Sequence, residues 1–335
     1  MRLRSLVPKQ GTKLRCHEPR EDSLCGDAGD SLTFNNISRK GALASREPMA
    51  RYYALALTTR YWKPGTDYID EIVGAVKGKV ADGDFVIVSE KAISTAENNV
   101  VDESALEPGA TAKFLAIVWM PIAWGYSLGV VCHFGQRLLR RIRNYPAEFG
   151  SRHKQVALRY AGFSQALMFG SEGGIDGSNL PYSLVSMPLA NSCEIAGAIR
   201  RQIWGRLGKK VAVLIVDTDK TYTFGNFHFS PRPNPMRGIS SHGGVVAYVT
   251  GRALKLRRRP TPLAVAGLEL SAEEALTIAN VADRARGPGS GATVWDMAAR
   301  FKVAATSVTW DMLAQVKHTP IVIVRKAAPN KRSAS

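Results

Sequence analysis

Two acidic loops contain the residues of this chain whose types and spacing best suit chemistry. The stretch EGGIDGSN holds Asp176 and Asn179 among glycines and a serine, a composition that favours a turn over a helix. The stretch DTDKT begins with Asp217 and Thr218, directly after the apolar run VAVLIV. Because Mg²⁺ and Mn²⁺ prefer oxygen ligands, two such loops that meet in the fold would form a divalent-metal site.

Two other interpretations of these loops stay open at this point. Asp and Asn often bond to their own backbone, so both aspartates could be ordinary turn residues. An apolar strand followed by DxDxT also resembles the haloacid-dehalogenase phosphatases, in which Asp217 would attack phosphorus and Asp219 would be the general acid. That family needs a further acidic pair after a strand, and we find none after Glu274.

The elements around the second loop predict an α+β (mixed α/β) fold with mixed sheets. YSLVSMPL is typical of a strand, and the helix that follows can be capped by Asn191 with Glu194 and stopped by Gly208. The strand after it ends at Asp217. This strand-helix-strand crossover predicts a parallel strand pair, and ligands bind beyond the carboxyl ends of such strands. We therefore expect Asp217 at a strand end that faces a site.

Composition and charge bound the class of protein. The chain has 335 residues, 45% of them apolar, and a formal net charge of +17. We predict a disordered tail (1–47), a folded domain (48–327) and a frayed C-terminus (328–335). The positive charge attracts anions, but aromatic residues are not interleaved with it and no nucleic-acid-binding signature appears. A small polyanionic substrate accounts for the charge equally well and is the partner we expect, while a non-catalytic basic protein that binds nucleic acid stays open as an alternative.

One apolar segment, 114–132, is long enough to span a membrane and is followed by arginines. Pro121, Gly125 and Gly129 interrupt it, so we expect buried or interfacial helices instead. The first residues are charged and lack the apolar core of a secretory signal. These features together predict a soluble, cytoplasmic protein.

Two further segments could meet a phosphate. The glycines of GPGSGAT precede a helix whose N-terminus could offer backbone N–H groups, although no Walker pattern is present and a plain connecting loop is expected. Arg252, at the end of GGVVAYVTGR, could contact a phosphate or end a solvated strand.

Several segments, in order, resemble the coenzyme F420-0:L-glutamate ligases, which add γ-linked glutamate to a deazaflavin coenzyme. KPGTDYIDEI is similar to that family's proline-glycine-acid motif. DGDFVIVSEKAISTAEN is similar to its strand that ends in QKxxSKAEG. GGIDGSN resembles its NAGxDxSN, VAVLIVDTD its strand ending in DTFG, and TPIVIVR its C-terminal IPVVxVRG. The similarity spans about residues 48 to 327.

The resemblance implies GTP as co-substrate, two Mg²⁺ or Mn²⁺ ions, L-glutamate as the amine, and a homodimer. K⁺ is a further ion to test. Asp176 and Asp217 would hold one divalent ion and act in catalysis, and Thr218 would help to hold the second. The remaining implied residues are the GTP contacts Glu90, Lys91, Thr95 and Asn179 and the second-metal ligand Gln315.

The implied reaction transfers the γ-phosphoryl group of GTP to a substrate carboxylate, and the glutamate amine then attacks the acyl phosphate. Some motifs depart from the family. EGG replaces NAG, DTDKT replaces DTFGR, Thr95 stands where the family has a lysine, and extra sequence fills 286–310. The metal aspartates are retained, so a related amide-forming ligase with another acceptor stays open.

Overall fold

The computed structural model describes residues 52–327, apart from positions 171, 182, 242, 288, 290 and 292. This part of the chain has a mixed α/β fold with mixed sheets, which confirms the fold class predicted from the sequence. The predicted tail (1–47) and the predicted frayed end (328–335) lie outside the described residues.

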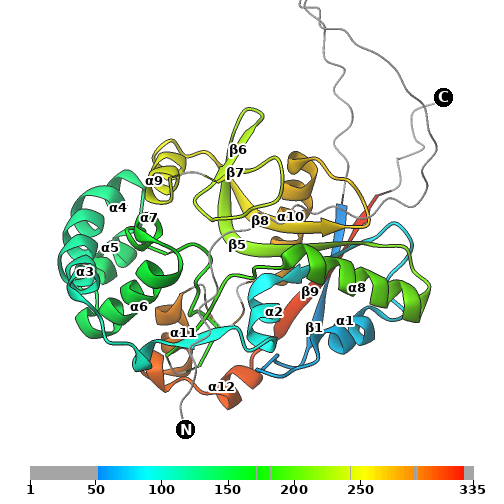
Figure 1. Ribbon diagram of the computed structural model, residues 1–335, viewed down its shortest axis with the longest axis horizontal. Helices are drawn as coiled ribbons and strands as arrows, with labels where there is room; N and C mark the ends of the chain where they lie inside the picture. Colours follow the sequence, from blue (N-terminus) through cyan, green and yellow to red (C-terminus); the bar gives the residue numbers. More distant parts are fainter. Residues whose placement is uncertain are drawn as a thin grey trace, which may run out of the picture. The chain divides into compact units, whose positions relative to one another are not determined.

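The strands of the larger sheet are β1 (Tyr52–Thr59), β2 (Phe85–Ser89), β5 (Ala212–Phe224), β6 (Phe227–Ser230), β7 (Ser240–Ser241), β8 (Arg257–Ala266) and β9 (His318–Lys326). Their order is β1-β9-β2-β5-β6-β7, and β8 also pairs with β5 (Figure 1). β2 runs parallel to β5, whereas β9 is antiparallel to both β1 and β2, and β8 is antiparallel to β5. A separate two-stranded antiparallel sheet joins β3 (Val100–Asp102) and β4 (Leu184–Ser186).

The helices fall into three sets. Those beside the larger sheet are α1 (Tyr68–Val76), α2 (Glu90–Ala96), α8 (Ser192–Leu207) and α10 (Ala272–Arg286). A second set lies together, away from α1 and α8 in Figure 1: α3 (Ala110–Phe114), η2 (Leu115–Leu128), α4 (Gly129–Val131), α5 (Gln136–Arg143), α6 (Ala147–Tyr160) and α7 (Phe163–Ala166). The others are η1 (Glu103–Ala105), α9 (Val245–Ala253), α11 (Val294–Phe301), η3 (Ala305–Ser307) and α12 (Trp310–Ala314).

The larger sheet is covered on both faces. Side chains alternate along β2, so that Val86 and Val88 join the core under α1, α2 and α8, whereas Phe85 and Ile87 join the core under α10. β5 alternates in the same way. Apolar side chains fill both faces of these parallel strands. Polar side chains that could form a site are therefore found beyond the end of β2 and in the irregular part of β5.

The apolar segment 114–132 lies almost entirely within one continuous helix made by α3, η2 and α4. It is long and apolar enough to cross a membrane, with a mean hydropathy of 1.7, and 33% of the stretch is buried; by length and composition alone this is weak evidence for a membrane. Met120 and Trp124 pack in the core formed with α5, whereas Ile117 and Ile122 are exposed. The segment predicted as buried or interfacial helices is thus one helix, buried on one side and exposed on the other.

Two predicted details of the crossover are wrong. The strand before α8, β4, was expected to pair with β5, but it pairs with β3 in the small sheet. The parallel partner of β5 is β2. Asn191 precedes α8 as predicted, but its side chain makes no capping hydrogen bond. Gly208 ends α8 in the left-handed conformation, which agrees with the prediction.

Candidate functional site

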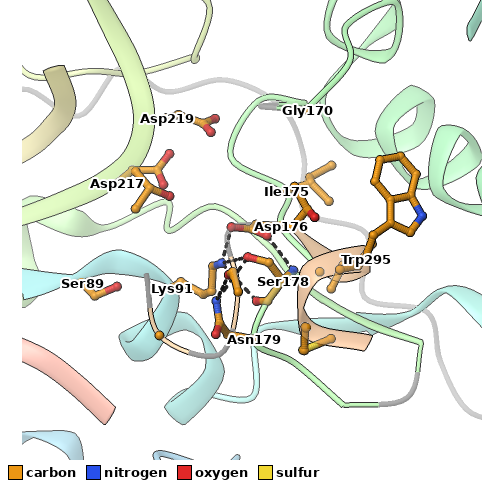
Figure 2. A pocket seen from close by; sticks show the side chains of 18 of the residues that line it. Ser89, Lys91, Gly170, Ile175, Asp176, Ser178, Asn179, Asp217, Asp219 and Trp295 are labelled. Atoms are coloured by element: carbon orange, nitrogen blue, oxygen red, sulfur yellow. Dashed lines mark hydrogen bonds and ion pairs between the residues drawn. The ribbon is translucent and has the colours of Figure 1, made fainter. Parts of the chain in front are cut away.

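A cavity of about 780 Å³ lies beyond the C-terminal end of β2, beside β5, and its size is within the range of small-molecule sites. Figure 2 shows its acidic side: Asp176 comes from the loop before β4, Asp217 and Asp219 come from β5, and Lys91 comes from α2. The predicted site residues that line this cavity are Lys91, Thr95, Asp176, Asn179, Asp217 and Thr218.

Asp176 is held in place by its backbone and by both carboxylate oxygens. Its N–H and C=O exchange hydrogen bonds with Ser186 of β4, at 3.2 and 3.0 Å. One carboxylate oxygen accepts the Ser178 N–H at 2.7 Å, which is the turn bond expected of an aspartate here. The other forms an ion pair with Lys91. The turn interpretation and the binding interpretation of Asp176 are therefore both compatible with its geometry.

Asn179 connects this loop to the glycine loop before α11. It adopts the left-handed conformation with φ of 58°, and its carbonyl accepts the hydroxyl of Tyr61. Its side-chain amide donates to the carbonyl of Gly291 at 3.1 Å. Gly287, Gly289 and Gly291 also line the cavity, so the expected plain loop is in fact part of the site.

Asp217 does not end its strand, contrary to the prediction. β5 continues to Phe224 because β8 offers it an antiparallel partner along most of its length. The register shifts between Asp217 and Lys220, where Asp217 lies opposite Thr261 and Lys220 opposite Pro260. This bulge, instead of a strand end, aims Asp217 and its neighbours at the cavity.

A buried arginine that the sequence did not point to links two of the predicted residues. Arg232 donates from Nη1 to Asp217 and from Nη2 to Glu90, both at 2.6 Å. Glu90 also accepts the N–H of Leu189 at 2.8 Å. Burial raises the pKa of Glu90 to about 7, although the Arg232 guanidinium acts in the opposite direction. Glu90 thus lies behind the cavity wall and supports Arg232.

Two further predicted residues are placed differently from each other, since Thr95 lines the cavity and Gln315 does not. Thr95 is buried, and its hydroxyl donates to the carbonyl of Lys91 at 2.8 Å, within the same helix. Gln315 is exposed after the last residue of α12 and does not line the cavity. The structure therefore does not bring Gln315 together with the predicted metal ligands.

Basic side chains line the cavity where α10 ends. Lys220 and Arg286 both contact Asp283, at 3.3 and 2.9 Å. Burial and the nearby Arg286 lower the pKa of His318 to about 4, so that its imidazole is neutral at pH 7. This basic region faces the same cavity as the two aspartates and suits an anion.

A second charged cluster lies in the wall of the cavity and consists of Glu103, His153, Lys154 and Glu172, of which all but Lys154 line the cavity. His153 contacts Glu103 at 2.5 Å, and Lys154 contacts Glu172 at 2.9 Å. Burial by itself would lower the pKa of His153, but the two carboxylates raise it to about 10. The imidazole is therefore charged at pH 7 and ties η1 to α6.

The two loops supply carboxylate and hydroxyl oxygens, the ligand type that a hard divalent cation prefers. Within the described part of the chain, Oδ1 of Asp217 accepts no hydrogen bond, and Thr218 adds a hydroxyl beside it. Among the same residues, no group of three or more His, Cys, Asp or Glu side chains is placed to hold a metal ion. Mg²⁺ commonly binds through one or two carboxylates and takes its other ligands from water and phosphates, so the two aspartates that line this cavity are of a kind that such an ion uses.

The fold and the cavity define a mixed α/β protein with a cavity of small-molecule size, lined by acidic and basic side chains, beside its parallel strands. Comparison with known proteins gives the family. The family model described as F420-0:Gamma-glutamyl ligase matches residues 56–325. The chain is also 34% identical over 285 residues to an uncharacterised protein of Methanocaldococcus jannaschii, which covers 81% of this chain and 96% of that protein. The chain belongs to the F420-0:γ-glutamyl ligase family, whose members form γ-glutamyl bonds.

The family match confirms the resemblance stated from the sequence motifs. It also decides between the enzymes considered for DTDKT, because the matched family is one of ligases and not of haloacid-dehalogenase phosphatases. Small-molecule substrates such as glutamate follow from the family.

Proposed function

We propose that this chain is a GTP-dependent and divalent-metal-dependent amide ligase that joins L-glutamate to a substrate carboxylate. The acceptor is a phosphorylated deazaflavin, coenzyme F420-0, or a related carboxylate. The observation that carries the proposal is that Asp176 and Asp217, far apart in the sequence, line one cavity with Lys91 in a chain of this family.

The reaction has two steps. An oxygen of the acceptor carboxylate attacks the γ-phosphorus of GTP, the bond to the β-phosphate oxygen breaks, and GDP leaves. The glutamate amine then attacks the acyl carbon, inorganic phosphate leaves, and the amine loses a proton. Both steps bring anions together, so the protein must supply positive charge.

The side chains of the cavity suit these tasks. Lys91 and Arg286 would contact the triphosphate, and Gly287, Gly289 and Gly291, which also line the cavity, would let it approach their backbone closely. Two Mg²⁺ or Mn²⁺ ions held by Asp176, Asp217 and Thr218 would neutralise charge on the transferring phosphoryl group and on the leaving diphosphate. Arg232 holds Asp217 in position from the buried side.

The test is an incubation of the full chain with GTP, Mn²⁺, L-glutamate and the phospholactyl deazaflavin, followed by chromatography of nucleotides and products. We expect GDP and a glutamylated product in equal amounts. GDP without a glutamylated product would indicate that another acceptor is used. Release of phosphate from simple monoesters without GTP would contradict the proposal.

We also propose, from the family, that the enzyme is cytoplasmic and works as a homodimer. Light scattering of the purified chain without detergent measures both solubility and mass. A monomer at micromolar concentration would contradict the dimer, and recovery only in detergent would contradict a soluble enzyme.

A further inference from the structure

The long helix made by α3, η2 and α4 is apolar on both of its sides, but the fold covers only one of them. Met120 and Trp124 are fully buried in the core formed with α5. The other side carries a row of apolar side chains, each between 37% and 65% exposed, which we call the apolar face: Phe114, Ile117, Val118, Ile122, Tyr126, Val130 and Val131. A helix that is apolar all round is normally covered on every side. The apolar face is therefore expected to meet a partner.

The charged side chains next to the apolar face are basic. The sequence from 108 to 147, which contains the helix and α5, has five Lys and Arg residues and no Asp or Glu. Lys113 is exposed beside Phe114, where the helix begins. Toward the other end of the face, the Arg143 guanidinium lies over the ring of Tyr126, 4.3 Å from its centroid. Cations thus border the face toward both ends.

The position of Arg143 is fixed by packing. A Cβ added at Gly125 would meet Cγ of Arg143 at 2.8 Å, so α5 is in direct contact with the helix at this point. Nε of Arg143 also donates to the carbonyl of Gly125 at 2.9 Å. Arg140 is exposed one turn earlier on the same side of α5. Arginines whose stems pack on apolar surface and whose charged groups reach its border can pair with anions there.

Charge distinguishes between the occupants that such a face could have. In a symmetric dimer the same patch of two copies meets itself, so the two basic borders would face each other and repel. An anionic lipid surface offers apolar acyl chains to the face and negative headgroups to its border. The helix does not cross the bilayer, because Met120 and Trp124 hold its other side in the folded domain.

We propose that the apolar face is a membrane-docking surface that lies on an anionic lipid bilayer. The apolar row enters the interface between headgroups and acyl chains, and Lys113, Arg140 and Arg143 lie at the level of the headgroups. Attachment through one helix face is peripheral and reversible. This proposal goes beyond the ligase function, and vesicle binding can be measured without GTP or turnover.

The test is flotation of the purified full chain with vesicles of phosphatidylcholine, alone or mixed with phosphatidylglycerol. A protein with a net charge of +17 is attracted to any anionic vesicle, so the decisive variant leaves the charge unchanged. This variant is Ile117→Gln/Ile122→Gln, and its matched control is Leu254→Gln/Leu268→Gln, two side chains that are equally exposed but lie outside the helix. Leu254 follows α9, so the neighbouring Arg252 belongs to a helix and not to the strand end considered from the sequence.

We expect wild type to bind the mixed vesicles and to be released by salt. Ile117→Gln/Ile122→Gln should weaken this binding roughly 10-fold or more, because two apolar side chains no longer enter the interface. Arg140→Gln should weaken it about fivefold. The control should bind like wild type, and all variants should unfold at the same urea concentration, because the replaced side chains are exposed.

Three results would overturn the proposal. One is wild-type protein that does not bind mixed vesicles or binds neutral vesicles equally well. Another is unchanged binding by Ile117→Gln/Ile122→Gln, which would assign the attraction to the overall charge alone. The third comes from light scattering without vesicles, since a dimer that becomes monomeric in this variant would assign the apolar face to contacts between copies. Failure of the ligase function would appear separately, as absent GDP formation with vesicle binding intact.

Discussion

The guanidinium of Arg232 lies so close to Gly174 that a Cβ at position 174 would meet Nη1 at 1.7 Å. Gly174 also has φ of 94°, a conformation that side chains rarely adopt. The glycine pair of EGGIDGSN therefore does more than make a turn. It lets the loop of Asp176 pass directly over the arginine that holds Asp217, so the two acidic loops are positioned through one contact.

Replacing Gly174 with alanine should displace Arg232 and disturb both loops. We expect Gly174→Ala to lower the free energy of unfolding by about 3 kcal/mol or more, because the clash adds to the backbone strain. Ligase turnover should fall with it. Urea unfolding measures the first and GDP formation the second. Gly78→Ala is the matched control, with φ of 73° and nothing within 4 Å of the added Cβ, and it should lose only about 1 kcal/mol. Equal losses in the two variants would show that the contact with Arg232 does not matter.

Asp217→Asn should abolish turnover while the fold persists. An amide oxygen can still accept from Arg232, and Glu90 still balances the guanidinium, so we expect unfolding to become easier by only about 1–3 kcal/mol. The loss of negative charge should weaken Mn²⁺ binding strongly, which calorimetry with GTP present measures. Asp219→Asn is the control, since a ligase should retain much of its activity without that carboxylate. Normal turnover in Asp217→Asn would remove this residue from the mechanism.

The acidic loops could be found in the sequence because each combines turn chemistry with side chains that suit metals. Asp176 and Asp217 could be identified from these local signals and from the apolar strand that precedes Asp217. The buried strands could be predicted as well, since β2 and β9 are short apolar runs between polar segments.

Arg232 could not be found in this way, because its role depends on partners that only the fold brings near it. The arginine stands between prolines in SPRPNP, which indicates a rigid loop but not a buried ion pair. The length of β5 was missed for a similar reason. The Asp and Lys residues of DTDKT are depleted in strands, and the pairing with β8 overrides that preference. The local sequence pattern thus predicted which side chains form the site. The contacts that hold them, the ion pairs of Arg232 and the pairing of β5 with β8, form only in the folded chain.

Lys91→Met separates two roles of one lysine. Lys91 pairs with Asp176 and donates to the hydroxyl of Ser178 at 2.8 Å, so in this structure it occupies an oxygen that a metal ion would use. Without the ammonium group, Asp176 should attract Mn²⁺ more strongly, by several-fold in affinity. Turnover should nevertheless fall at least about tenfold, because the triphosphate loses a cation. Calorimetry with Mn²⁺ and steady-state kinetics measure the two effects. Weaker Mn²⁺ binding together with unchanged turnover would contradict both roles.

His153 should make the stability of the fold depend on pH above neutrality. Its pKa is about 10 in the folded chain, where Glu103 and Glu172 outweigh the effect of burial, against about 6.5 when unfolded. Because the folded form holds the proton more tightly, this contribution is complete below about pH 6.5 and is lost as the pH rises toward 10. Its slope cannot exceed about 1.4 kcal/mol per pH unit. Urea unfolding from pH 6 to 10 should give a flatter curve for His153→Gln than for wild type. The exposed His133→Gln should follow wild type. If the three curves have the same slope, the buried pair of His153 and Glu103 does not hold a proton in the folded state.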